Sequence, residues 1–546
     1  PLWLPRLEKE IFLARLEQDY PIDYTQGIRA LAGLIDYPEQ QRQDPLVIEM
    51  EETANLLIVG NAGCGKTMLI KTILLSMVRH YAPEDVQFYC MDFSSRTMKV
   101  FQQLPHCGGV AFSEEEEKVT RLLKLLQEMI EERKHILEKA GAGSYQEYRR
   151  MNEKLPLMIS FIDNYYEFVS QYNSLEDAFT RLVRDGVRYG IIFVVSLNST
   201  GDMRYRIRQN FEEILPIQMQ ERGDYMDAFG KSPEILPGKL PGRGLVLREK
   251  VLEYQAALPA EGETEEDRQQ MLRDMISESI RKYQNSQKAR EIPVLPENET
   301  YAEFWNRFGI QIKEGFLPLA YNRQTLKPEG INLKEDHCIC ISATKMKSIE
   351  LVFKNVIYAS KKAGYRVDYI QEGSQSDDDL TRLADASYRG FEEVKELLIS
   401  IKKGFKGTKQ EWTGYEGKRI ILIRDMKAFF ELVYNGKNPE AMDKLVEVFF
   451  GEGARRGVYF IGGFVSDVQS TYLYLPAGKI FTGYKKIWHL GGALNQQKLV
   501  QFAIPTTQQM KPLPVNEGHA VEEGETIEIY VPEPEGNLDE YSDSGH

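Results

Sequence analysis

The amino-acid sequence predicts an α/β protein of two tandem domains, each a mainly parallel sheet flanked by helices. Apolar runs of strand length alternate with longer helical patterns along most of the chain, which is typical of a parallel sheet covered on both faces. The order of these signals in the first half recurs in the second. Between the halves, residues 292–297 hold two prolines, which remove backbone donors and favour extended neighbours. We therefore expect domains at 1–290 and 291–546.

The first landmark is a glycine-rich loop at residues 60–67, Gly-Asn-Ala-Gly-Cys-Gly-Lys-Thr. It lies between an apolar run at 56–59 and a helical pattern at 68–75. This is a complete G-x-x-x-x-G-K-[ST] motif in a strand, loop and helix context. Gly60 and Gly65 let the backbone bend and approach phosphate closely, and the next helix presents free N–H groups at the positive end of its dipole. The motif therefore predicts a phosphate-binding loop.

Two side chains of this loop carry the expected chemistry. Lys66 would reach the outer phosphates of a nucleotide, and Thr67 would ligate magnesium. Cys64 is either a small filler or a thiol whose pKa is lowered by the helix N-terminus, which would make it reactive in an empty site. A loop that kept the motif and lost its ligand is the alternative interpretation. The residues predicted to bind the cofactor are Gly60, Asn61, Ala62, Gly63, Cys64, Gly65, Lys66, Thr67 and Met68.

A second landmark is a buried strand expected at 157–162, which ends in Asp163. A P-loop enzyme places at this point the carboxylate that orients magnesium. The interval between the two landmarks holds a strand at 86–92 and a long charged helix at 114–139, and another strand follows at 188–196. Because ligands of parallel sheets sit at the carboxyl ends of strands, the loop and Asp163 are expected to meet there.

The second half repeats the order of these signals. A strand at 337–341 precedes a loop and a helical pattern, a later strand at 419–424 ends at Asp425, and residues 455–461 echo residues 188–194. The spacing is far longer than that of any solenoid repeat, so we interpret the halves as two copies of one domain.

The repeated loop has lost its glycines. Aligned on Lys347 and Ser348, the two required glycines have become Ile341 and Met346. Side chains then stand where phosphate should approach the backbone, and β-branched Ile341 tolerates a positive φ badly. We expect weak or absent nucleotide binding there, and Lys347 is equally well interpreted as a solvated surface lysine.

Composition limits the remaining possibilities. The chain of 546 residues is 42% hydrophobic and 27% charged, and it has no run of about 18 apolar residues that could span a bilayer. A formal net charge of −14 argues against broad nucleic-acid binding. The five cysteines form no Cys-x-x-Cys pair, as expected for reduced thiols in a cytosol, and the seven histidines lack zinc-ligand spacing. Magnesium that arrives with nucleotide is the one expected metal.

The ends of the chain carry weaker signals. The chain opens with Pro1 and without an initiator Met, so we expect a piece of a longer protein whose membrane anchor lies elsewhere. A charged amphipathic helix is expected at 264–283, and the alternating pattern at 526–531 predicts an added edge strand. Acidic residues accumulate towards the end, and residues 537–546 are expected to be disordered.

With these residues in view, the chain resembles the cytosolic tail of a type VII secretion ATPase, the EssC/EccC class of the FtsK/SpoIIIE family. The resemblance is strong in the first half and weak in the second. It rests on residues 33–41 ahead of the loop, on the loop itself, on the strand ending at Asp163 with residues 165–168 behind it, and on the Leu-Pro-Gly-Arg-Gly stretch at 240–244. It implies two tandem RecA-like P-loop NTPase domains, the second and third ATPase modules of such a protein, with ATP and Mg²⁺ as ligands.

The resemblance also implies a function and partners. The chain would be a motor or docking segment that drives export of small helical proteins with a Trp-x-Gly turn. It would work in a hexameric ring, with other membrane components of the secretion system, at the cytoplasmic face of the membrane. The second domain would dock substrate, although Phe429, Phe430, Leu432 and Val433 fit a buried helix better than a docking groove. Two alternatives remain: a DNA translocase or conjugative coupling ATPase, and a platform for which nucleotide is only a structural ligand.

One departure from the family pattern concerns catalysis. In active members a Glu follows the magnesium-coordinating Asp, whereas this chain has Asn164 after Asp163. An amide can orient water but cannot take its proton, and a positioned general base is worth about 10² to 10⁴ in rate. We therefore expect slow hydrolysis in the first domain, unless Asp92 or Glu167 supplies the base.

The remaining catalytic candidates surround the predicted strand at 188–196. Arg184 and Arg188, together with Lys66, Asp163 and Asn164, make up the predicted catalytic set. Arg184 and Arg188 lie where related proteins carry an arginine finger, although such residues are more often solvated or ion-paired. Ser196 and Asn198, at the end of the strand, would either sense the γ-phosphate or satisfy the backbone.

Overall fold

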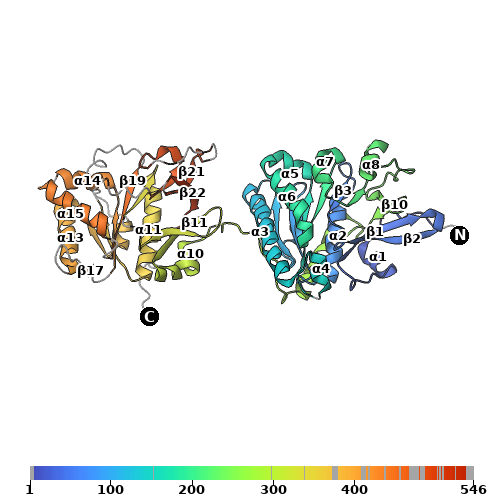
Figure 1. Cartoon of the computed structure of the whole chain (residues 1–546), viewed down its shortest axis with the longest axis horizontal. Coiled ribbons are helices and arrows are strands. Elements are labelled where there is room, and N and C mark those ends of the chain that lie inside the picture. The colour runs from blue at the N-terminus through green and yellow to red at the C-terminus, as the bar shows by residue number, and fades with distance from the viewer. Residues whose placement is uncertain are drawn as a thin grey trace. The chain divides into compact units, whose positions relative to one another are not determined.

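The computed structural model describes residues 5–536 except residues 152, 220, 297, 337, 372–378, 407–412, 416–417, 436–437, 454–456, 466–478, 480–485, 501, 503–505, 507–508 and 523. The chain divides into two compact units, Pro1–Val294 (unit 1) and Leu295–His546 (unit 2). Each unit has hydrophobic clusters of its own on the two faces of a sheet. Figure 1 labels the helices and strands of both units.

Unit 1 combines a six-stranded parallel sheet, of order β5-β4-β6-β7-β3-β8, with a four-stranded antiparallel sheet, of order β2-β1-β10-β9. The strands are β1 (Arg29–Tyr37), β2 (Arg42–Glu49), β3 (Leu56–Val59), β4 (Val86–Asp92), β5 (Cys107–Phe112), β6 (Leu157–Asp163), β7 (Ile191–Leu197), β8 (Glu213–Pro216), β9 (Arg243–Leu247) and β10 (Val251–Ala256). The helices are α1 (Leu13–Asp19), α2 (Lys66–His80), α3 (Glu116–Ala140), α4 (Tyr145–Arg150), α5 (Tyr165–Gln171), α6 (Glu176–Gly186), α7 (Tyr205–Arg208), α8 (Arg222–Phe229) and α9 (Glu265–Lys282).

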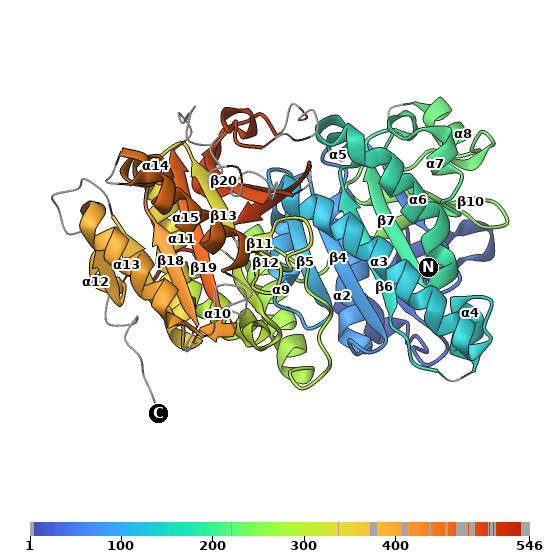
Figure 2. The ribbon, with the colours of Figure 1, turned by 60° about the vertical axis from the view of Figure 1, so that its left-hand side comes forward.

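Helices cover both faces of the parallel sheet of unit 1. One hydrophobic cluster joins the sheet to α2 and α9, and a second cluster joins it to α3, α5 and α6, which Figure 2 shows in front of the strands. Strands β4, β6 and β7 are buried at every residue, because helices exclude water from both sides. The adjacent strands β6, β7 and β3 therefore bring their carboxyl ends together in a rigid, dry frame.

Unit 2 has one large sheet of ten strands, of order β12-β11-β22-β21-β20-β13-β19-β18-β14-β15, and a separate pair, β16 and β17. The strands are β11 (Phe316–Asn322), β12 (Pro328–Asn332), β13 (Cys338–Ala343), β14 (Arg366–Ile370), β15 (Ala386–Tyr388), β16 (Phe405–Lys406), β17 (Thr413–Tyr415), β18 (Arg419–Ile423), β19 (Val458–Val465), β20 (Lys486–Gly492), β21 (Leu513–Glu522) and β22 (Glu525–Tyr530). The helices are α10 (Tyr301–Phe308), α11 (Met346–Lys362), α12 (Asp379–Leu383), α13 (Gly390–Gly404), α14 (Met426–Asn435) and α15 (Pro439–Glu452).

The strand orders of the two units correspond along their whole length. The parallel order β5-β4-β6-β7-β3-β8 of unit 1 reappears as β15-β14-β18-β19-β13-β20, and the antiparallel order β2-β1-β10-β9 reappears as β12-β11-β22-β21. The predicted fold class, two tandem α/β domains with mainly parallel sheets, is confirmed. Unit 2 differs in that β21 pairs with β20, which joins the two sheets into one.

Two predictions concern the C-terminal part of the chain. The predicted strand at 526–531 exists as β22, but it lies between β21 and β11 and is not an edge strand. Residues 537–546, expected to be disordered, lie outside the described residues.

Among the helices that the structure describes, none has the length and apolar character needed to cross a bilayer.

Candidate nucleotide-binding site

The glycine loop of unit 1 connects β3 to α2 at the carboxyl end of the parallel sheet. Gly65 has a φ of 109°, which side chains rarely adopt, and a Cβ there would lie 3.2 Å from the amide nitrogen of Gly242. A Cβ on Gly60 would lie 2.7 Å from Cys64 Sγ, whereas a Cβ on Gly63 would meet no atom within 4 Å. No described side chain caps the start of α2, so its first N–H groups remain available to an anion. The loop therefore fits a bound phosphate group.

The ammonium group of Lys66 lies within this loop. Its Nζ donates hydrogen bonds to Gly60 O at 2.7 Å, Asn61 O at 2.9 Å and Asn198 Oδ1 at 3.1 Å. All three acceptors are neutral, so an anionic phosphate oxygen would be a stronger partner for the charge. Asn198, at the end of β7, thus belongs to the same cluster as the loop.

Asp163 lies at the centre of the polar cluster. Thr67 Oγ1 donates to Asp163 Oδ2 at 2.6 Å, and Ser196 Oγ donates to Asp163 Oδ1 at 2.6 Å. The carboxyl group is 3% exposed, and its burial raises the pKa, although the two hydroxyl donors oppose that shift. The helix α2 and the strands β6 and β7 hold these three side chains. The sequence analysis named Thr67 and Asp163 for magnesium, and Ser196 as either a γ-phosphate sensor or a partner of the backbone.

This donor set fits magnesium better than a protein-only metal centre. Within the described part of the chain, no group of three or more His, Cys, Asp or Glu side chains could hold a metal ion. Mg²⁺ prefers one or two protein oxygens and takes its other ligands from phosphate and water. The Thr67 hydroxyl and the Asp163 carboxylate would supply those protein oxygens.

Asn164 continues from Asp163 in a left-handed conformation, with a φ of 72°. Its backbone N–H donates to Ser196 Oγ at 2.8 Å, and its side-chain Nδ2 makes a long contact of 3.4 Å with Phe93 O. Its buried Oδ1 accepts no hydrogen bond from the described residues. Asn tolerates the left-handed region because its short amide can bond locally. The residue can thus present a neutral acceptor beside Asp163, but it carries no carboxylate.

The two alternative bases are engaged in local structure. Asp92 is buried and accepts backbone N–H groups from Ser94 at 3.0 Å and Met98 at 3.0 Å, which anchors the turn after β4. Glu167, on α5, accepts a hydrogen bond from Gln171 Nε2 at 2.6 Å. Among the described residues, neither carboxylate forms a hydrogen bond with Thr67, Asp163 or Ser196.

The two candidate arginine fingers lie away from the site of their own unit. Arg184 makes two hydrogen bonds with Asp185, of 2.7 and 3.0 Å, and Arg188 Nε donates to Gly143 O at 2.9 Å. Both residues precede β7, whereas the phosphate loop lies at the carboxyl ends of the strands. The length of β7 separates the two ends by roughly 20 Å at about 3.3 Å per residue. A role of either arginine towards a neighbouring subunit stays a prediction.

The expectation of a reactive Cys64 is wrong. The side chain is 4% exposed, and burial raises the pKa of the thiol more than the nearby Lys66 charge lowers it. Cys64 is therefore a packed filler beneath the loop, the other interpretation of the sequence.

Sequence reasoning missed the groups that support the loop from outside the motif. Gly242 donates its N–H to Cys64 O at 2.8 Å, and Asn61 donates its N–H to Gln218 O at 2.7 Å. The stretch 240–244 entered the sequence analysis only through the family resemblance, and nothing in the sequence marks Gln218. Both supports join the loop to segments more than 150 residues away, which local patterns do not reveal.

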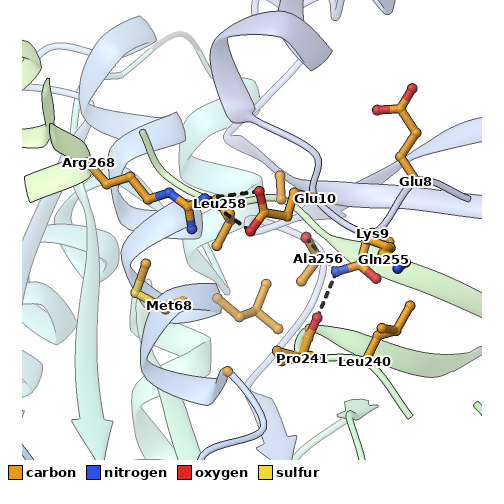
Figure 3. Close-up of a pocket in the computed structure, with 14 residues that line it drawn as sticks. Glu8, Lys9, Glu10, Met68, Leu240, Pro241, Gln255, Ala256, Leu258 and Arg268 are labelled. Atoms are coloured by element: carbon orange, nitrogen blue, oxygen red, sulfur yellow. Dashed lines mark hydrogen bonds and ion pairs between the residues drawn. The ribbon is translucent and has the colours of Figure 1, made fainter. Parts of the chain in front are cut away.

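A cavity of about 620 Å³ adjoins the loop. Gly65 and Met68 line it from the phosphate-loop side, with Leu240 and Pro241 and the end of β10 (Figure 3). Its volume and mostly apolar lining suit a drug-sized, flat ligand group with a few polar contacts.

The corresponding loop of unit 2 is much shorter. Ile341 lies inside β13, where it pairs with Gly463 and Trp488, so it stands in regular strand backbone. Only residues 344–345 separate β13 from α11, where unit 1 has residues 60–65. No loop of this length can wrap around a phosphate group.

The strand register places a cation where unit 1 has its magnesium carboxylate. Met158 N–H bonds to Gly190 O at 2.9 Å, and Arg419 N–H bonds to Gly457 O at 2.8 Å. Both glycines have a positive φ and precede β7 and β19, so these bonds are equivalent anchors. Counting from them, residue 424 corresponds to Asp163. The sequence alignment with residue 425 is therefore shifted by one residue.

The side chains at these two positions have other roles. Arg424 Nη2 lies 3.3 Å from Glu350 Oε1 on α11, and Asp425 Oδ1 accepts the N–H of Lys427 at 2.9 Å at the start of α14. A guanidinium group would repel Mg²⁺ rather than bind it. Among the described residues, unit 2 thus lacks a counterpart of Asp163.

The chain itself fills the space beside the short loop. Thr344 Oγ1 donates to Gly491 O, and a Cβ on Gly491 would lie 2.7 Å from Ser348 Oγ. Ser348 is fully buried beneath this contact, whereas Lys347 is exposed. The carboxyl end of β20 therefore closes the place that a phosphate would need.

The apolar residues named as possible substrate contacts in unit 2 belong to its core. Phe429, Phe430 and Val433 on α14 are fully buried, and Leu432 packs against the same cluster. The core interpretation of this helix is confirmed.

Comparison with known proteins agrees with this architecture. Residues 29–233 match the model of the FtsK/SpoIIIE family. The chain is 26% identical over 378 residues to the ESX secretion system protein EccC of Geobacillus thermodenitrificans, covering 68% of the chain and 25% of that protein. It is 22% identical over 550 residues to the ESX secretion system protein YukB of Bacillus subtilis, covering 97% of the chain and 35% of that protein. The chain therefore spans about a quarter to a third of these curated relatives.

Two solved structures share the fold of the whole chain. EssC (ATPases 2 and 3) from Geobacillus thermodenitrificans has a TM-score of 0.84 at 21% identity, and covers 97% of this chain and 100% of that chain. Thermomonospora curvata EccC (ATPases 2 and 3), in complex with a signal sequence peptide, has a TM-score of 0.62 at 20% identity, with 98% and 100% coverage.

Proposed function

We propose that this chain, a relative of the type VII secretion ATPases, is an ATP-binding segment of such a secretion system. Its residues 29–233 match the FtsK/SpoIIIE family model. Unit 1 binds ATP with Mg²⁺ and hydrolyses it slowly, and unit 2 binds no nucleotide and serves in docking. The observation that carries the proposal is the contrast between the Lys66, Thr67, Asp163 and Ser196 cluster beneath an open loop and the closed, cation-bearing counterpart in unit 2.

Different residues of unit 1 bind different parts of the nucleotide. The loop N–H groups and the Lys66 ammonium hold the phosphates, and the base and ribose enter the cavity beside Met68. Magnesium, held by the Thr67 hydroxyl and oriented by the Asp163 carboxylate, would neutralise charge on the phosphates. Asn164 can hold a water molecule through its amide oxygen, but no proton leaves that water to Asn164. The missing proton acceptor is the reason for slow turnover.

The proposed partners are supported by the names of the relatives. These relatives are ESX and type VII secretion proteins, and one fold neighbour holds a signal sequence peptide, which supports a secreted protein as the cargo. That the cargo is small and helical is what the family resemblance implies. The chain works as part of a hexamer with other secretion-system membrane components, at the cytoplasmic face of the membrane.

Isothermal titration of the full chain with ATP and Mg²⁺ tests the nucleotide part of the proposal. One site is expected, and it should disappear in Lys66→Ala. A pull-down with the small secreted helical proteins of the source organism tests the partner part. Absence of nucleotide binding by the wild type would overturn the proposal.

The second candidate is a DNA translocase or conjugative coupling ATPase, which by the family resemblance would share the fold of the domain matched at residues 29–233. The net charge of −14 disfavours it, since nucleic-acid binding needs cations that neutralise phosphates. Binding of duplex DNA at physiological salt would favour this candidate over secretion.

A further inference from the structure

The cavity beside the phosphate loop is lined in part by the start of the chain. Glu8, Lys9 and Glu10 contribute to its lining opposite the residues of the phosphate loop and β10 (Figure 3). We call residues 7–12 the N-terminal segment. It has little buried side-chain area of its own at residues 8–10, which are exposed. Leu7 and Ile11 pack into the core of unit 1, and further contacts hold residues 8–10 between them.

Arg243 supplies the first of these contacts. This buried side chain, 5% exposed, donates from Nη2 to Leu7 O at 3.1 Å and to Glu8 O at 3.0 Å. Its Nε donates to Gln255 Oε1 at 2.8 Å, and Gln255 Nε2 in turn donates to Pro241 O at 3.0 Å. A guanidinium group can reach several acceptors at fixed angles, which the single ammonium of lysine cannot reproduce. Arg243 thus ties the segment to the opposite lining of the same cavity.

Arg268 supplies the second contact, at the rim. From α9 its Nη2 donates to both carboxylate oxygens of Glu10, at 3.0 and 2.9 Å, and its Nε donates to Gly262 O at 3.0 Å. The dashed lines in Figure 3 show the bonds between Arg268 and Glu10. The backbone adds one bond here, from Leu258 N–H to Ile11 O at 2.7 Å. Two arginines that are distant in sequence therefore fix one short segment.

We propose that Arg243 and Arg268 are positioning residues that hold residues 7–10 as a wall of the nucleoside cavity. The wall then contributes affinity for the base and ribose and none for the phosphates, which the glycine loop holds alone. Moving the N-terminal segment would weaken nucleotide binding without altering the loop. This inference rests on the proposed function, because it assigns a role in the same nucleotide site.

Two ligands separate the wall from the loop. Mg-ATP uses both regions, whereas magnesium tripolyphosphate fills the loop alone. Binding of each to the full chain is measured by calorimetry for the wild type, Arg243→Lys, Arg268→Gln and a chain without residues 1–10. Arg248→Gln is the matched control, because Arg248 lies at the far end of the same hairpin and bonds to Glu213 at 2.9 Å, away from the cavity.

The expected result is selective. In Arg243→Lys, in Arg268→Gln and in the shortened chain, ATP should bind about tenfold more weakly, because charged hydrogen bonds that hold the wall are lost. Tripolyphosphate affinity should change by less than about threefold, and the control should match the wild type. In hydrogen exchange, ATP but not tripolyphosphate should protect residues 7–12.

Other results would overturn the inference. Equal weakening of both ligands would show that Arg243 acts through the loop or the fold, and unchanged ATP affinity in Arg243→Lys, Arg268→Gln and the shortened chain would show that the wall contributes nothing. Should Arg243→Lys fail to fold, Arg268→Gln and the exchange experiment decide. A wild type that binds both ligands leaves the proposed function standing in each case, whereas a wild type that binds neither removes that function and this inference with it.

Discussion

Replacing Asn164 by Glu should convert the slow nucleotide site of unit 1 into a faster one. Asn164 follows Asp163, which accepts hydrogen bonds from Thr67 and Ser196 at 2.6 Å each. The Asn164 amide oxygen is buried and accepts no hydrogen bond from the described residues. A carboxylate there would supply the proton acceptor that the cluster lacks.

Two effects of opposite sign determine the outcome. A positioned general base contributes about 10² to 10⁴ in rate, so kcat should rise at least about a hundredfold. Asn164 has a φ of 72°, and a residue without its local hydrogen bonding pays about 1 to 2 kcal/mol in the left-handed region. The free energy of unfolding should therefore fall by about that amount. Phosphate release reports kcat and thermal unfolding reports stability. A fall in the free energy of unfolding therefore does not hide a rise in kcat.

The assay is phosphate release under saturating Mg-ATP, with thermal unfolding measured on the same samples. Asn164→Gln is the matched control, since Gln has the length and shape of Glu but cannot accept a proton. It should share the lower stability of Asn164→Glu and keep the low turnover of the wild type. Brisk wild-type hydrolysis that Asn164→Glu fails to raise would refute the reasoning, as would equal acceleration by Glu and Gln.

Three further predictions concern both units. In Lys66→Ala, the full chain should retain no measurable ATP site, because unit 2 has no open loop; residual stoichiometric binding would contradict this. Cys64 should react slowly with iodoacetamide at neutral pH, because burial raises the pKa of its thiol, and mass spectrometry showing rapid labelling of the folded protein would disprove it. Burial lowers the pKa of His489 to about 4, below its ordinary value of 6.5, so the unfolded state takes up a proton first as the pH falls. The contribution of His489 to the free energy of unfolding should therefore be fully present above about pH 6.5 and decline between pH 6.5 and 4, by at most about 3 kcal/mol. Denaturant titrations followed by tryptophan fluorescence should show that decline, and it should be smaller in His489→Asn.

The architecture of the chain could be predicted because its signals are local. Continuous apolar runs predicted β6 and β7, and the complete motif predicted the loop before α2, with Asp163 at the end of another strand of the same sheet. The repeated order of strands could also be predicted, because the apolar runs follow one another in the same order in each copy. What could be predicted was thus the backbone frame and the residues that the motif itself contains.

The rest depended on register and on distant contacts. Strand pairing gives Arg424 the position of Asp163, whereas the sequence alignment gave that position to Asp425. Both residues are charged and follow the apolar run, so the apolar pattern does not tell which of them is at the strand end. The burial of Cys64 and the support from Gly242 arise from segments far along the chain. The role of Arg243 depends on backbone carbonyls of residues 7–8, which carry no side-chain signature.

A crystal structure of the full chain grown with a non-hydrolysable ATP analogue and Mg²⁺ tests the central claim most directly. We predict the triphosphate in the loop at residues 60–67, with the metal beside Thr67 and Asp163, and no ligand at residues 344–348. An empty loop in unit 1, or an analogue bound in unit 2, would contradict the account.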